Sequence, residues 1–96
     1  MNVLFEPVEI FQSEDYEMSI EFESTVSDVF IRYQNADGIL KEISGVDEEN
    51  NEYSFLLESA DTDAARVDVY DLIVHYTESG KKQYVKVSNY LKIVEL

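Results

Sequence analysis

The sequence predicts an all-β fold, an antiparallel sandwich of seven to eight short strands in one domain that spans residues 1–96. Apolar and polar residues alternate with a period of two in several segments, which is typical of strands with one buried face. Polar segments with Gly, Asn or Asp recur about every ten residues, the interval of turns in small sandwiches. Seven tyrosines and five phenylalanines also favour strands over helices.

The segment 66–96 is expected to organise the sheet, because two β-branched and aromatic runs flank a hairpin turn at residues 78–81. The first run is apolar on both faces, with Val67, Val69 and Ile73 on one and Tyr70, Leu72, Val74 and Tyr76 on the other. Such a strand belongs in the middle of a sheet, with both of its faces covered. In the closing strand, Ser88 and Asn89 predict a bulge or a bend.

The beginning of the chain predicts an edge strand and a half-buried strand. Residues 3–5 and 8–11 are short apolar pieces separated by Pro7, which cannot donate to a strand ladder and therefore indicates a kinked edge strand. At this kink the chain can switch from one sheet to the other. Residues 16–23 alternate apolar side chains with Glu and Ser, which predicts a strand with an acidic outer face.

A hairpin is expected next. Its strands, residues 28–34 and 39–44, flank Asn35-Ala36-Asp37-Gly38, a tight turn in which Asp-Gly tolerates positive φ. Weak alternation in the second strand indicates an edge of the sheet.

A further strand is expected over residues 52–58, after an acidic loop at 45–51. Residues 59–65 are expected to be a loop or a single helical turn capped by Asp61 or Thr62. The pattern of strands matches an antiparallel sandwich of immunoglobulin type, although the cysteine pair and core tryptophan of antibody domains are missing. A small open barrel is the alternative architecture.

The charge of the chain is strongly negative and unevenly placed. Its formal net charge is −14, and residues 1–65 carry 17 acidic side chains against only Arg32 and Lys41. Nucleic-acid phosphates and anionic membranes repel such a chain, so direct binding to either is not expected. The charged partners that it favours are basic protein surfaces or cations, and the acidic side chains also promote solubility.

No catalytic constellation is apparent, and we expect a non-enzymatic protein without catalytic, cofactor or metal sites. The chain has no Cys, and its single histidine, His75, has no neighbouring motif partner, so a structural role is expected. The loop 47–52 and the segment 61–63 contain oxygen ligands that calcium prefers. The ligand order of an EF-hand and its central glycine are missing there, and solvated loops are expected instead.

Asp71 is the one carboxylate that interrupts the apolar part of the central strand. A carboxylate at such a position needs a polar partner. Arg32, Arg66 or a backbone turn is expected to supply it.

Four segments carry a resemblance to a known family. They are Glu14-Asp15-Tyr16-Glu17-Met18-Ser19-Ile20; Val29-Phe30-Ile31-Arg32-Tyr33 leading to Asp37-Gly38; Tyr53-Ser54-Phe55; and Tyr70-Asp71-Leu72-Ile73-Val74 with Ser79-Gly80-Lys81 and Leu91-Lys92-Ile93-Val94. Their order resembles small phage-encoded immunoglobulin-like domains, including the N-terminal domain of baseplate upper proteins and related tail or neck proteins. The chain departs from that pattern at Ala64-Ala65-Arg66 and at Asn89, where the family usually has glycine. The resemblance implies no catalytic residues.

These features lead to two expected functions. The first is a non-enzymatic structural or adaptor protein of a phage tail, baseplate or neck, which contacts other virion proteins and is compatible with a homo-oligomer. The alternative is a small acidic phage inhibitor that mimics a nucleic acid and blocks a basic cleft of a host or defence protein. A sandwich that binds carbohydrate or cations is a third, weaker expectation.

Either main function places the protein in the virion or the host cytoplasm. No apolar run approaches the roughly 20 residues that span a bilayer, and the N-terminal residues lack the features of a signal peptide. The residues expected to make the contacts are all acidic: Glu17, Glu21, Glu23, Asp47, Glu48 and Glu49.

Overall fold

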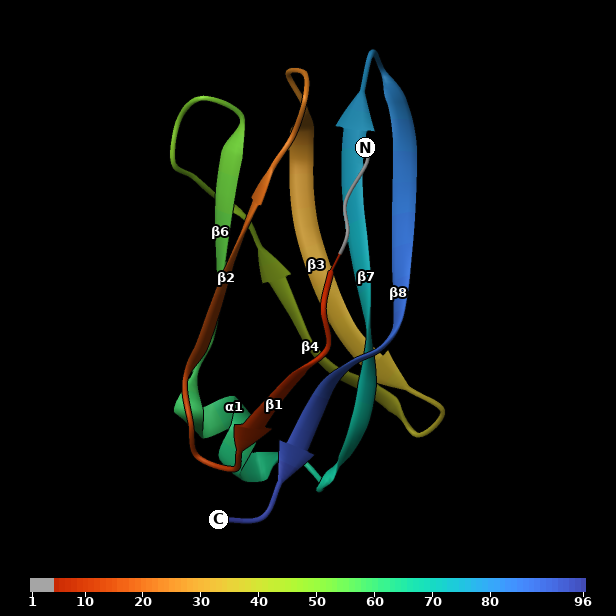
Figure 1. Ribbon diagram of the computed structural model, residues 1–96. Coiled ribbons are helices and arrows are strands. Elements are labelled where there is room, and N and C mark those ends of the chain that lie inside the picture. Colours follow the sequence, from red (N-terminus) through yellow and green to blue (C-terminus); the bar gives the residue numbers. More distant parts are fainter. Residues whose placement is uncertain (1–4) are drawn as a thin grey trace.

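The structure is a computed structural model that describes residues 5–96, and it places them in two β-sheets packed against each other (Figure 1). The larger sheet has the order β1 (Val8–Phe11), β8 (Lys81–Val94), β7 (Asp68–Glu78), β3 (Ser27–Asn35) and β4 (Gly38–Ser44). The smaller sheet has the order β2 (Tyr16–Glu21), β6 (Glu52–Leu57) and β5 (Val46–Asp47). The all-β prediction is confirmed. Residues 3 and 4 of the expected first strand lie outside the described residues.

The core lies between the two sheets and follows from the period-two patterns. Tyr70, Leu72, Val74 and Tyr76 of β7 are buried on the face that meets the smaller sheet. Opposite them lie Met18 and Ile20 of β2 and Phe55 and Leu57 of β6, all of them buried. Because alternate residues of a strand point to opposite faces, Glu17 and Glu21 of β2 are left exposed on the outside.

The prediction that both faces of the central strand are covered is wrong. β7 does lie between β8 and β3 in the larger sheet, as expected. On its outer face, however, Val69 and Ile73 are only half-buried, and Val67, which precedes the strand, is 51% exposed. The physical reason is that the smaller sheet covers one side only, so neighbouring side chains of β3 and β8 give the outer face its partial shielding.

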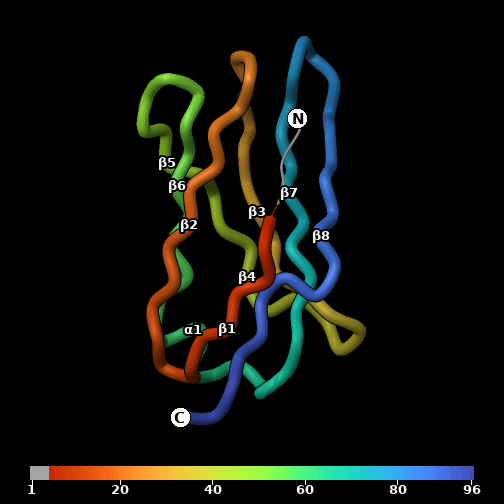
Figure 2. The backbone as a smooth tube through the Cα atoms, in the orientation of Figure 1, coloured from red at the N-terminus to blue at the C-terminus, as the bar shows by residue number. Residues whose placement is uncertain are grey.

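The prediction of a purely antiparallel sandwich is also wrong, because β1 pairs with β8 in parallel, with Val8 opposite Leu91 and Phe11 opposite Val94. Figure 2 shows these two strands side by side near the C-terminus. They are joined by most of the chain rather than by a tight turn, so no hairpin fixes their relative direction. As expected, β1 follows Pro7 and lies at an edge.

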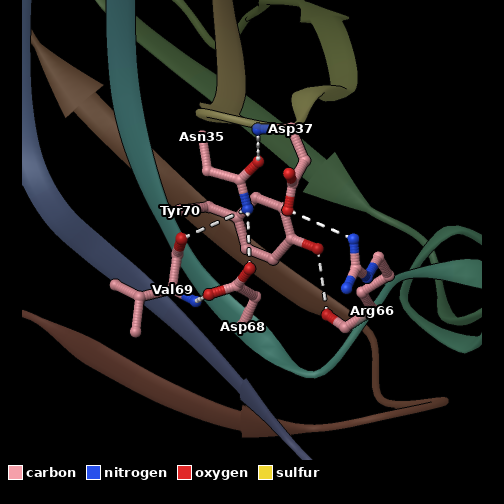
Figure 3. A network of polar contacts seen from close by, with 6 residues as sticks. All are labelled: Asn35, Asp37, Arg66, Asp68, Val69 and Tyr70. Atoms are coloured by element: carbon pink, nitrogen blue, oxygen red, sulfur yellow. Dashed lines mark hydrogen bonds and ion pairs between the residues drawn. The ribbon is translucent and has the colours of Figure 1, made fainter.

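Both predicted hairpins are confirmed. Ser79 (φ 52°) and Gly80 (φ 76°) form a two-residue turn between β7 and β8, and positive φ at both positions matches the twist of the strands. At the β3–β4 turn, Gly38 has φ 135° and the Asp37 N–H donates to Asn35 Oδ1 at 2.9 Å. Figure 3 shows that Asn35 Nδ2 also donates to Asp68 Oδ2 at 3.2 Å, which joins this turn to the start of β7.

The expected helical turn is present as α1 (Ser59–Ala64), but its predicted cap is wrong. Neither Asp61 nor Thr62 caps it, because the N-cap position is Glu58, three residues before Asp61. The Ser59 N–H instead donates to Oδ1 of Asp15, which lies 44 residues away in sequence. A local sequence pattern cannot show a cap that comes from another connection.

Candidate functional site

The outer face of the smaller sheet gathers acidic side chains from two neighbouring strands. Glu17, Ser19 and Glu21 alternate outward on β2, and Glu21 lies directly opposite Glu52 of β6. Glu48 extends over the same strands, since its Oε1 accepts a hydrogen bond from Ser54 Oγ at 2.8 Å. We call Glu17, Glu21, Glu48 and Glu52 the acidic face.

The acidic face has no basic residue within its own sheet. Residues 5–31 and 42–65 contain neither Lys nor Arg, and these segments include β2, β5 and β6. The two bases between them belong to β3 and β4 and are already paired: Arg32 with Glu42 at 2.9 Å and Lys41 with Asp61 at 3.3 Å. Glu21 and Glu52 therefore face each other without a counterion among residues 5–96, an arrangement that destabilises a sheet.

Three of the six residues predicted to make contacts lie on the acidic face, namely Glu17, Glu21 and Glu48. Glu23 follows the end of β2. Asp47 is engaged by its own turn, because its Oδ1 accepts the backbone N–H of Glu49 at 2.8 Å.

The prediction missed Glu52, because only the register of β6 against β2 shows that it opposes Glu21. The loop considered for calcium is a tight turn with positive φ at three consecutive residues, 49–51. Within residues 5–96, no group of three or more acidic or histidine side chains is arranged to hold a metal ion.

A second candidate lies on the outer face of the larger sheet, where three rings gather. Phe30 of β3 stacks on His75 of β7 at 4.2 Å between ring centroids, and Tyr84 of β8 contacts His75 edge to face at 4.7 Å. A pocket of about 270 Å³ adjoins these rings, with Asp28, Lys82 and Gln83 among its lining residues. Tyr84 is 61% exposed, whereas Phe30 and His75 are half-buried.

The surroundings of His75 favour its neutral form over its protonated form. Burial is the main cause that lowers the pKa of His75, the positive charge of Arg32 lowers it further, and Glu42 opposes the shift. Its Nε2 is buried and has no hydrogen-bond partner among residues 5–96. A covered nitrogen is poorly placed to reach a substrate, and the aromatic contacts give His75 a packing role.

The partner of Asp71 is a backbone N–H, but it comes from the irregular part of β8 and not from Arg32, Arg66 or a turn. Asp71 Oδ1 accepts the N–H of Asn89 at 2.8 Å, and Lys86 Nζ lies 3.7 Å from Oδ2. Asn89 has φ 53° within an irregular part of the β7–β8 pairing, which confirms the predicted bulge. Arg66 instead contacts Asp37 at 3.2 Å near the β3–β4 turn (Figure 3).

Fold and surface together define a small all-β protein with two sheets, an acidic outer face on one and an aromatic pocket on the other. No family model matches this chain, and no curated protein matches it in sequence. In the described part of the chain, no helix is long and apolar enough to cross a bilayer.

Proposed function

We propose that this chain is an immunoglobulin-like β-sandwich that acts without catalysis, as a structural or adaptor protein of a phage tail, baseplate or neck. In this proposal its acidic face binds a basic surface of another virion protein. The partner then supplies the positive charge that the smaller sheet lacks.

The observation that carries the proposal is the unneutralised acidic face. A stable sheet gains from opposite charges in cross-strand pairs, yet Glu21 opposes Glu52 and Glu17 lies on the same side of the sheet. The backbone that holds these carboxylates is already ordered, so binding has to order only their side chains. Their charge also speeds the approach of a basic partner.

The same face supports a second candidate, an acidic inhibitor that occupies the nucleic-acid cleft of a host or defence protein. Carboxylates on a rigid strand offer that cleft the negative charge that it normally receives from phosphates. Competition separates the two candidates. An inhibitor displaces duplex DNA from a basic DNA-binding protein at near-equal concentrations, whereas a virion adaptor leaves the DNA bound.

Fluorescence anisotropy with a labelled oligo-arginine peptide tests the role of the acidic face. The E17Q/E21Q/E52Q variant removes three charges from the face. The matched control E6Q/E58Q/E95Q removes three from exposed positions elsewhere. At about 0.2–1 kcal/mol for each exposed charge pair, the first variant should bind about tenfold more weakly than wild type. Equal weakening by both variants would mean that only total charge matters, and the proposal would fail.

A further inference from the structure

Among the strand edges that remain open within residues 5–96, which include that of β4, two lie on β2 and β8. β2 pairs only with β6, and β8 pairs with β1 only through residues 91–94. Residues 81–87 of β8 therefore pair with β7 alone, and Figure 1 shows no strand beyond them on the right-hand side. An open edge presents backbone N–H and C=O groups that can pair with another strand.

The side chains on these two edges have opposite charges at matching positions. Lys82, Tyr84 and Lys86 point to the outer face of the larger sheet, because they lie opposite Thr77, His75 and Ile73. Glu17, Ser19 and Glu21 point to the outer face of the smaller sheet. On each edge, two side chains of like charge lie four residues apart, which is about 13 Å along a strand. The residue midway between them is Tyr84 on β8 and Ser19 on β2.

The backbone groups that point outward belong to the same residues. The Phe22 N–H donates to Asn51 O, on the β6 side, so the alternate residues Glu17, Ser19 and Glu21 direct their backbone groups away from β6.

On β8, the two-residue turn makes Glu78 and Lys81 a hydrogen-bonded pair. Lys82, Tyr84 and Lys86 therefore direct their backbone groups away from β7.

We propose that β2 of one copy pairs antiparallel with residues 81–87 of β8 in a second copy. The register sets Glu17 opposite Lys86, Ser19 opposite Tyr84 and Glu21 opposite Lys82, with the outward backbone groups of both strands facing each other. This inference rests on the proposed function, because it names the β8 edge of a second copy as the basic partner of the acidic face.

The buried sides of the two strands also fit this register. It places Met18 beside Val85 and Tyr16 beside Val87, and both valines are only half-buried in the single chain. Lys82 has no ion pair among residues 5–96, and Lys86 has only the 3.7 Å contact with Asp71. Both lysines are therefore able to pair with the carboxylates of another copy.

Each contact uses β2 of one copy and β8 of the next, so the interface is heterologous. A chain of copies therefore keeps a free β2 edge at one end and a free β8 edge at the other. Every copy also carries a net charge of −14, which opposes association at low salt. At 0.15 M salt the Debye length is about 8 Å, so adjacent strands still attract while distant charges are screened. Association should therefore be weaker at 0.01 M than at 0.15 M salt.

Sedimentation velocity at 0.15 M salt, up to about 1 mM protein, tests this contact. Wild type should grow beyond a dimer as concentration rises. In the E17Q/E21Q variant the β2 edge should no longer bind, and in the K82Q/K86Q variant the β8 edge should no longer bind. Each variant should therefore stay monomeric when it is alone. An equimolar mixture should form 1:1 dimers and nothing larger, because each variant keeps the edge that the other has lost. The control E6Q/E95Q should behave as wild type.

A backbone variant tests strand pairing separately from charge. Ser19→Pro removes an outward N–H of β2 without removing a bond to β6, so it should abolish assembly while circular dichroism stays unchanged. Wild type that remains monomeric at every concentration, or assembly that survives Ser19→Pro in a folded chain, would overturn the inference. If that monomer still binds oligo-arginine through Glu17 and Glu21, only this inference fails and the proposed function stands.

Discussion

The carboxylate of Asp71 accepts a hydrogen bond from the backbone N–H of Asn89 at 2.8 Å, across the irregular part of the β7–β8 pair. This contact lies between two parts of β8: residues 81–87, which pair with β7 alone, and residues 91–94, which also pair with β1. Asn89 adopts φ 53°, a left-handed conformation in which its N–H is not used by a regular ladder. The side chain of Asp71 therefore accepts the hydrogen bond that a backbone carbonyl would accept in a regular ladder.

Replacing Asp71 by Ala should lower the free energy of unfolding by about 1–2 kcal/mol, because the Asn89 N–H loses a charged acceptor. Urea denaturation measures this change. Ser88→Ala, at an exposed neighbouring position, should change the stability by less than about 0.5 kcal/mol. If Asp71→Ala were as mild as Ser88→Ala, the hydrogen bond would not stabilise the bulge.

The one-sided burial of β7 predicts different costs for two adjacent substitutions. Leu72→Ala should lower the free energy of unfolding by about 2–5 kcal/mol, because Leu72 is fully buried between the sheets. Ile73→Ala, on the half-buried outer face, should cost clearly less, since fewer apolar contacts are lost. Equal costs in urea denaturation would indicate that both faces of the strand are covered.

His75 should make the stability of the protein depend on pH. Its folded pKa lies below the unfolded value near 6.5, so the unfolded chain binds the proton more readily. The stabilisation from neutral His75 is therefore complete above about pH 6.5 and is lost as the pH falls toward the folded pKa.

The His75→Phe variant keeps an aromatic ring against Phe30 and cannot be protonated. Urea denaturation of both proteins between pH 7.5 and 5 isolates the contribution of His75, because the carboxylates are common to both. The free energy of unfolding of wild type should fall more steeply with falling pH than that of the variant. Parallel curves would show that His75 is protonated equally easily in both states.

Because Glu21 and Glu52 repel each other across the strands, we expect that a substitution of Glu21 that weakens oligo-arginine binding will stabilise the chain. Glu21→Lys replaces a repulsive cross-strand pair with an attractive one and should raise the free energy of unfolding by about 0.5–1 kcal/mol. The same variant should bind oligo-arginine more weakly. A variant that was both less stable and equally active in binding would remove the reason for assigning function to this face.

The sequence was sufficient to predict most of the strands and both hairpin turns, because period-two patterns and Asp-Gly or Ser-Gly turns are local signals. It missed β5, which lies within residues 45–51, where a loop was expected. It predicted the bulge at Asn89, but not that a backbone N–H of β8 is the partner of Asp71. The parallel pairing of β1 with β8 and the cap that Asp15 provides to α1 depend on contacts between distant segments. The role of Glu52 was missed for the same reason, since it follows from register rather than from composition.

In the proposed function, the acidic face is the surface that meets a basic partner. The most direct measurement is an NMR titration of ¹⁵N-labelled protein with the oligo-arginine peptide, followed by mapping of the amide shifts. If the acidic face binds the peptide, the largest shifts should occur at Glu17, Ser19, Glu21, Glu52 and Ser54. Shifts that centre instead on Phe30, His75 and Tyr84, or that spread evenly over all exposed carboxylates, would contradict the proposed function.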